Sequence, residues 1–274
     1  MQKLLFLLTR LQEEKSYFFV PYYYGCFSFQ ANQDMATLGT YGYVRIENKN
    51  YILCDYTSHY LCQLDLFDQQ HVRDIHSKYS GMSQDELITY TYVHYPFYAI
   101  NSTIAKEMLT SEQYAKVMAQ KRHINEKQLF TIGYEGVSLE QYINKLILCD
   151  VHVLCDVRKN AYSQKYGFSK SQLEKACQGA HIQYIHIPTL GIESEKRTCL
   201  QKQQDYDSLF AEYERTTLKD NAQSLLYVYN LIQSENRVAL TCFEKDPKQC
   251  HRTRVANALM KMSKGEYSLN QIVF

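Results

Sequence analysis

Residues 237–252, RVALTCFEKDPKQCHR, contain the pattern that decides the fold of the second half of the chain. The run 237–243 is mostly apolar and predicts a buried strand. A polar loop follows it, and a helix is expected from about Cys250 to Met262. A continuous apolar strand that leads into a helix is typical of parallel sheets covered by helices.

The same alternation of strand and helix runs through the preceding hundred or so residues. Strands are predicted at 128–132, 151–157 and 182–187. Helices are predicted after Ser138 and Ser169, because each serine is followed three residues later by glutamine, a capping-box pattern. Further helices are expected at 203–217 and 220–234. Residues 128–274 are therefore predicted to form an α/β domain, with a mainly parallel sheet and flanking helices.

The first half of the chain, residues 1–118, has a different pattern and is predicted to be a mostly helical domain. Helices are expected at 2–14, 28–38, 65–78 and 83–90, and residues 104–125 are expected to form one helix or a helix pair. Alternation at 43–54 around Asn48-Lys49-Asn50 predicts a small β-hairpin. Helices with one hairpin favour either a helical interaction domain or a winged-helix-like arrangement.

The overall charge argues against a protein that wraps duplex DNA without sequence preference. The 274 residues include 30 basic and 29 acidic side chains, for a net charge of +1. Such a protein normally carries a basic excess, because neutralising phosphates needs Lys and Arg. Any basic surface must therefore be local. Tyrosine is abundant, at 25 residues, and most of these side chains are predicted to pack in the core.

The nine cysteines are an odd number and include no CxxC pair. A zinc ribbon needs paired cysteines, so neither a metal ion nor another cofactor is expected. The apolar N-terminal run LLFLL is followed at once by charged residues, which argues against a signal peptide or a membrane span. We expect free thiols and a cytoplasmic protein.

Polar and reactive residues follow each predicted strand of the second half. In open α/β sheets, ligands bind at the carboxyl ends of the strands, so these residues are candidates for one shared pocket. The candidates, in chain order, are Tyr134, Glu135, Asp156, Arg158, His186, Glu244, Cys250, His251 and Arg252.

The turn Cys250-His251-Arg252 is the strongest of these features. A thiol at the start of a helix feels exposed backbone N–H groups and the helix dipole, which favour the thiolate, and Arg252 is suited to bind an anion such as phosphate. Alternatively, Cys250 points inward and Arg252 pairs with Asp246 or Glu244.

The other candidates also have two interpretations each. Asp156 is either a general base or the ion-pair partner of Arg158, and His186 is either a general acid or base or a histidine of the sheet rim. Cys242 occupies the position at a central strand tip where rhodaneses and protein tyrosine phosphatases carry their catalytic cysteine. Arg252 comes ten positions after it, so the phosphatase signature is absent, and we predict a buried, hydrophobic Cys242.

These motifs also carry a family resemblance. The segments TIGYEG at 131–136, DVR at 156–158, GFS at 167–169 and the run from Cys242 to Arg252 resemble domain-of-unknown-function family 488 over about residues 128–262. The chain has Lys159 where the family usually has a proline. The resemblance implies a bacterial, cytosolic protein with a role in nucleic-acid processing or defence, and it brings no settled activity. The first half is faintly similar to antitoxin-like domains of the SocA or Panacea kind.

Two hypotheses about function follow. The first is an enzyme that acts on a phosphate-bearing substrate, most readily nucleic acid, with Arg158 and Arg252 binding the anion. Tyr134, Glu135 and Glu244 would complete the binding site. Asp156, His186, Cys250 and His251 would carry the catalysis. The second is a non-catalytic regulator that binds nucleic acid, or a protein partner through its first half. Neither hypothesis involves a membrane.

Overall fold

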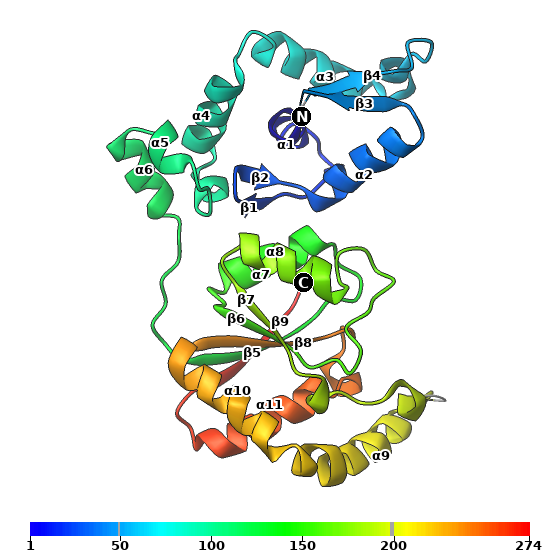
Figure 1. Ribbon diagram of the computed structural model, residues 1–274, viewed down its shortest axis with the longest axis vertical. Coiled ribbons are helices and arrows are strands. Elements are labelled where there is room, and N and C mark those ends of the chain that lie inside the picture. The colour runs from blue at the N-terminus through cyan, green and yellow to red at the C-terminus, as the bar shows by residue number, and fades with distance from the viewer. Residues whose placement is uncertain (49, 198–199) are drawn as a thin grey trace. The chain divides into compact units, whose positions relative to one another are not determined.

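The computed structural model describes residues 1–48, 50–197 and 200–274 (Figure 1). Contacts divide the chain into two compact units, Met1–Lys121 and Arg122–Phe274, and each is described by itself. In the described ranges, no helix is both long enough and apolar enough to cross a membrane.

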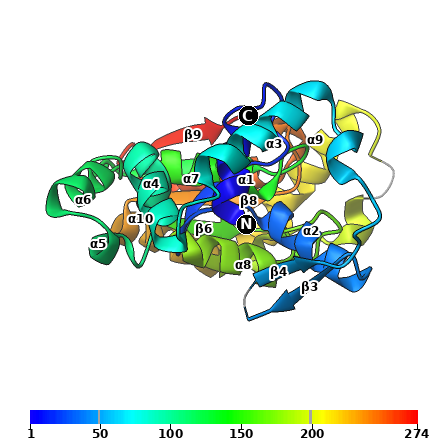
Figure 2. The ribbon, with the colours of Figure 1, turned by 90° about the horizontal axis from the view of Figure 1, so that it is seen from above.

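The N-terminal unit is mostly helical, as predicted. Its helices and strands are α1 (Gln2–Thr9), β1 (Val20–Tyr22), β2 (Gly25–Phe27), α2 (Phe29–Thr40), β3 (Val44–Glu47), β4 (Asn50–Leu53), α3 (Leu66–Tyr79), α4 (Gln84–His94), α5 (Ala105–Met108) and α6 (Ser111–Met118), with 3-10 turns at Tyr60–Gln63 and Pro96–Ala99. The antiparallel pair β3–β4 is the predicted hairpin (Figure 2). Lys49 of its predicted turn lies outside the described residues.

Two details of the N-terminal unit differ from the prediction. The first helix ends at Thr9, five residues early, although its buried Phe6 and Leu7 still pack in the core with Phe19. The aromatic run at 18–25 forms a second hairpin, β1–β2, which we did not predict. Segment 104–125 is a helix pair, α5 and α6, and the second begins with a capping box at Thr110.

The C-terminal unit is a five-stranded sheet covered by helices. Its elements are β5 (Gln128–Gly133), α7 (Leu139–Leu148), β6 (Val153–Asp156), α8 (Lys170–Gly179), β7 (Gln183–His186), α9 (Gln203–Tyr213), a π-helical turn (Glu214–Leu218), α10 (Ala222–Glu235), β8 (Arg237–Cys242), α11 (Arg252–Ser263) and β9 (Ser268–Ile272), with 3-10 turns at Pro188–Leu190, Ser194–Arg197 and Pro247–Gln249. The strand order is β7-β6-β8-β5-β9, and all four pairings are parallel. The predicted fold class is confirmed.

The central strand β8 is buried along its whole length, because helices cover both faces of the sheet. Helices α7 and α8 lie over one face, and α10 and α11 lie over the other (Figure 1). On the second face, Val238 and Leu240 of β8 pack into one core with Val228 of α10 and Leu259 of α11. The stretch 237–252, with which the sequence analysis began, therefore supplies the central strand of the C-terminal unit.

Of the two serines that were predicted to cap a helix, one does so in the structure. Ser138 forms a capping box with Gln141 and starts α7. Ser169 does not cap α8, because its hydroxyl donates to the Ser163 carbonyl instead. Strand β9 was not predicted: its sequence, SLNQI, is polar, and it joins the sheet at an edge, next to β5.

Candidate functional site

A cleft of about 340 Å³ opens at the carboxyl ends of β5, β6 and β8. Four cationic side chains line it, and we call it the cationic cleft: Arg158, Lys159, Lys165 and Arg197. No carboxylate is among the described residues that line it. Three of the cations have acidic partners outside the lining, since Arg158 pairs with Asp156, Lys159 pairs with Glu193 at 2.6 Å and Arg197 pairs with Glu244.

Arg158 is held in place by three neighbours. Its Nε and Nη2 donate to the Asp156 carboxylate at distances of 2.5–3.1 Å, and its Nη1 donates to the Tyr134 hydroxyl at 2.5 Å. Tyr184 donates its hydroxyl proton to the same carboxylate at 2.6 Å. Asp156 is fully buried and Arg158 is 6% exposed, so the guanidinium is fixed at one wall of the cleft.

These contacts are reflected in the pKa values of the network. Burial by itself would lower the pKa of Arg158, but the hydrogen bonds and charge of Asp156 raise it above its ordinary value. Burial, followed by the charge of Asp156, raises the pKa of Tyr184. Arg158 therefore stays cationic, and Asp156 serves to position it.

His186 supports the same network from behind the cleft. Its Nε2 lies 2.9 Å from the carbonyl oxygen of Arg158, which can only accept a hydrogen bond, so Nε2 carries the proton. Neither His186 nor Asp156 is among the residues that line the cleft. Both lie one layer behind the position where a ligand would bind.

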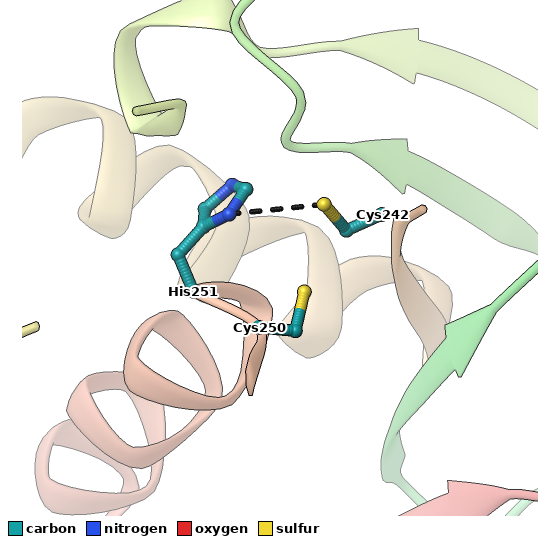
Figure 3. A group of neighbouring side chains, drawn as sticks. All are labelled: Cys242, Cys250 and His251. Atoms are coloured by element: carbon teal, nitrogen blue, oxygen red, sulfur yellow. Dashed lines mark hydrogen bonds between the residues drawn. The ribbon is translucent and has the colours of Figure 1, made fainter. Parts of the chain in front are cut away.

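The floor of the cleft holds a group that we call the thiol–imidazole cluster: Cys242, Cys250 and His251 (Figure 3). Cys242 comes from the end of β8, and the other two precede the first turn of α11. The two thiol sulfurs and a ring nitrogen of His251 all lie within 4.8 Å of one another. Cys242 Sγ is 3.7 Å from His251 Nδ1. Cys242 and His251 line the cleft, whereas Cys250 does not.

The cluster is buried, and its protonation differs from our expectation. Burial by itself raises the pKa of a thiol, but at Cys242 the hydrogen bond of Cys250 and the adjacent His251 outweigh it and lower the pKa well below its ordinary value. Burial and the neighbouring Cys242 raise the pKa of Cys250, opposite to the direction that we predicted from the helix start. Cys242 also raises the pKa of His251 against the effect of burial.

Arg252 and Glu135 shape the loop between β8 and α11. Arg252 is 1% exposed, and its guanidinium donates to the backbone carbonyls of Glu244 and Lys245. Glu135 accepts a hydrogen bond of 2.8 Å from the Lys245 amide. Neither side chain lines the cleft. Arg252 thus braces the loop, which is a third arrangement beside the two that the sequence suggested.

Glu244 lies beside the cluster rather than in the cleft lining. Its Oε2 is 3.1 Å from the sulfur of Cys242, and its Oε1 faces Arg197. Burial first, and the charge of Cys242 second, raise the pKa of Glu244.

Two glycines allow the loops around the cleft to approach closely. A methyl group at Gly133 would lie 2.0 Å from the Glu244 carbonyl oxygen, and one at Gly191 would lie 2.1 Å from the Lys159 amide nitrogen. Both contacts are with backbone atoms, which cannot rotate away.

Gly133→Ala should therefore displace the Glu244 loop and lower the free energy of unfolding by about 1–3 kcal/mol, as overpacking does in a close-packed core. Urea-induced unfolding measures the change. Gly81→Ala is the control, because a methyl group there meets nothing within 4 Å. Equal stability of the two variants would contradict the close approach.

The structure brings together part of the predicted set. Tyr134, Arg158 and His251 line the cleft, while Glu135, Asp156, His186, Glu244, Cys250 and Arg252 contact or support the residues around it. Sequence reasoning missed Lys165, placed Arg197 in the loop after the third strand without choosing it as a site residue, and treated Cys242 as a buried hydrophobic side chain. The signal in the sequence that could have identified Cys242 is its position at the end of a central strand.

A comparison with protein-family models agrees with the fold and with the motifs of the C-terminal half. Residues 138–259 match the family model described as Domain of unknown function DUF488. The match covers α7 through most of α11 and begins after the TIGYEG segment, so the predicted resemblance of the C-terminal half is confirmed. No curated protein and no solved structure matches the chain. The DUF488 match names no activity, and the faint N-terminal similarity stays a prediction.

Proposed function

We propose that the C-terminal DUF488 unit is an enzyme that acts on a phosphate-bearing substrate, and that nucleic acid is the substrate class. The observation that carries the proposal is the cationic cleft, in which four cations converge on a buried thiol–imidazole cluster. Lysine and arginine side chains are the usual ligands of phosphate oxygens, and a fixed Arg158 presents its charge without reorganisation.

The rim of the cleft supports nucleic acid over a free small anion. Tyr162 and Phe243 line the cleft and are 71% and 42% exposed. Exposed aromatic rings beside a cationic groove stack on the bases of single strands, because every base has a π-face. The chain as a whole has a net charge of only +1, so binding depends on this local site.

Lys165→Met and Arg197→Met should each weaken binding of a fluorescent single-stranded oligonucleotide by about tenfold, or about 1.4 kcal/mol, and lower the salt dependence by about one ion. Lys261→Met is the matched control, because this lysine is exposed on α11, away from the cleft. Fluorescence anisotropy over a salt series measures both effects, and denaturing gels of DNA and RNA substrates report turnover.

Two outcomes would overturn the proposal. One is equal binding by the cleft variants and the Lys261→Met control. The other is tight binding without any product from DNA or RNA, which is what the non-catalytic regulator predicts.

We further propose a cytoplasmic protein whose residues 1–118 form a separate interaction domain for a protein partner. The division of contacts between Lys121 and Arg122 supports the separation. All eight cysteines in the described ranges are free thiols, which suits a reducing compartment.

A further inference from the structure

We propose that Cys242, Cys250 and His251 bind a zinc ion, with one coordination position open to the cationic cleft. The inference deepens the proposed function by naming the chemistry at the cleft floor, and it rests on that function only for the role of the ion. The ion-binding site itself stands on the geometry of the cluster.

The spacing of the donor atoms suits a zinc ion. Zinc binds thiolate sulfur at about 2.3 Å and imidazole nitrogen at about 2.0–2.1 Å, so tetrahedral ligand atoms lie about 3.5–3.8 Å apart. Cys242 Sγ and His251 Nδ1 are already 3.7 Å apart, and the sulfur of Cys250 is within 4.8 Å of both. Figure 3 shows the three side chains converging from the end of β8 and the start of α11.

The orientation of His251 also suits a metal ligand. Nε2 of His251 lies 2.8 Å from the carbonyl oxygen of Val157, which can only accept a hydrogen bond. Nε2 therefore carries a proton, so in the neutral imidazole the lone pair is on Nδ1, which faces the sulfur of Cys242. A backbone carbonyl that fixes the ring in this way is the usual outer partner of a metal-binding histidine.

The number and type of ligands indicate an open coordination position and favour zinc over other metals. Cys242 and His251 line the cleft, whereas Cys250 does not, so a fourth coordination position would open toward the cleft that the cations also line. Three ligands with an open position are typical of catalytic zinc sites, and two thiolates with one imidazole favour zinc over magnesium or calcium. Glu244 contacts the first of these ligands, with Oε2 at 3.1 Å from Cys242 Sγ.

The spacing explains why the sequence did not predict this site. The two cysteines are eight positions apart and the histidine follows the second at once, which is no zinc-ribbon pattern. Only the turn Pro247–Gln249 brings Cys250 and His251 back beside the tip of β8.

The test is the metal content of the full-length chain after reconstitution with zinc and gel filtration, measured by mass spectrometry of the elements. We expect about one zinc ion per chain, and at least about a tenfold lower affinity in Cys250→Ser and His251→Gln. Cys177→Ala is the matched control, because Cys177 is equally buried but belongs to no such ligand group among the residues that the structure describes, and the variant should bind zinc like the unchanged chain. Cobalt substitution should give the absorption of a thiolate-bound ion in the unchanged chain and in the control.

A second measurement does not depend on the folding of variants. In the unchanged chain, zinc should protect Cys242 and Cys250 from alkylation by iodoacetamide, and removal of the ion by a chelator should abolish the protection. Less than about a tenth of an ion per chain, or zinc retained in Cys250→Ser, would overturn the proposal. So would equal alkylation with and without zinc, or a disulfide between the two cysteines in the purified protein. Oligonucleotide binding by Lys165→Met is read independently, so failure of the zinc site and failure of the proposed function are distinguishable.

Discussion

Replacing Asp156 with alanine should lower the free energy of unfolding of the C-terminal unit by about 3–5 kcal/mol, because it leaves a buried guanidinium without its counter-ion. Asp156 is 0% exposed and accepts hydrogen bonds from both Arg158 and Tyr184. Removing one partner of a buried pair costs far more than the pair contributes, since the remaining charge stays out of water.

Native-state hydrogen exchange of the β8 amides measures this loss, because these core amides exchange only when the unit opens. The double variant Asp156→Ala with Arg158→Met should recover at least about 2 kcal/mol, since it removes the stranded charge. Glu193→Ala is the control: it breaks the exposed pair with Lys159, which should change stability by about 0–1 kcal/mol. An Asp156→Ala protein as stable as this control would show that Arg158 does not depend on the carboxylate.

Arg252→Met should lower the free energy of unfolding by about 2–4 kcal/mol while weakening oligonucleotide binding less than Lys165→Met does. The guanidinium of Arg252 is buried and donates to two backbone carbonyls, at Glu244 and Lys245. Methionine fills a similar volume but leaves both carbonyl oxygens without this donor. The sequence suggested an anion-binding Arg252, so the variant separates that role from bracing the loop.

Hydrogen exchange and fluorescence anisotropy on the same samples measure the two effects. Arg252→Lys should be intermediate in stability, because a single ammonium group cannot reproduce the fork of the guanidinium. If the Arg252→Met protein is stable but no longer binds the oligonucleotide, Arg252 binds the anion and does not brace the loop.

The general location of the site could be predicted from the sequence because parallel strands place their carboxyl ends at one edge. Tyr134, Arg158 and His251 follow three different strands, and all three reach the same cleft. The roles of the other candidates could not be predicted, because a role depends on which atom a side chain faces. His186 faces the carbonyl of Arg158, and Arg252 faces the carbonyls of its own loop.

The amino-acid sequence by itself determined the α/β architecture, since apolar strands and capped helices such as the one after Ser138 are local patterns. It also determined the edge of the sheet at which reactive residues gather. Only the tertiary structure decided that Lys165 and Arg197 join Arg158 around one cleft, and that Cys242 meets Cys250 and His251. The physical reason is that these contacts depend on how the loops after β6, β7 and β8 fold back over the sheet. Such loops are set by close backbone contacts, as at Gly133 and Gly191, rather than by any periodic pattern.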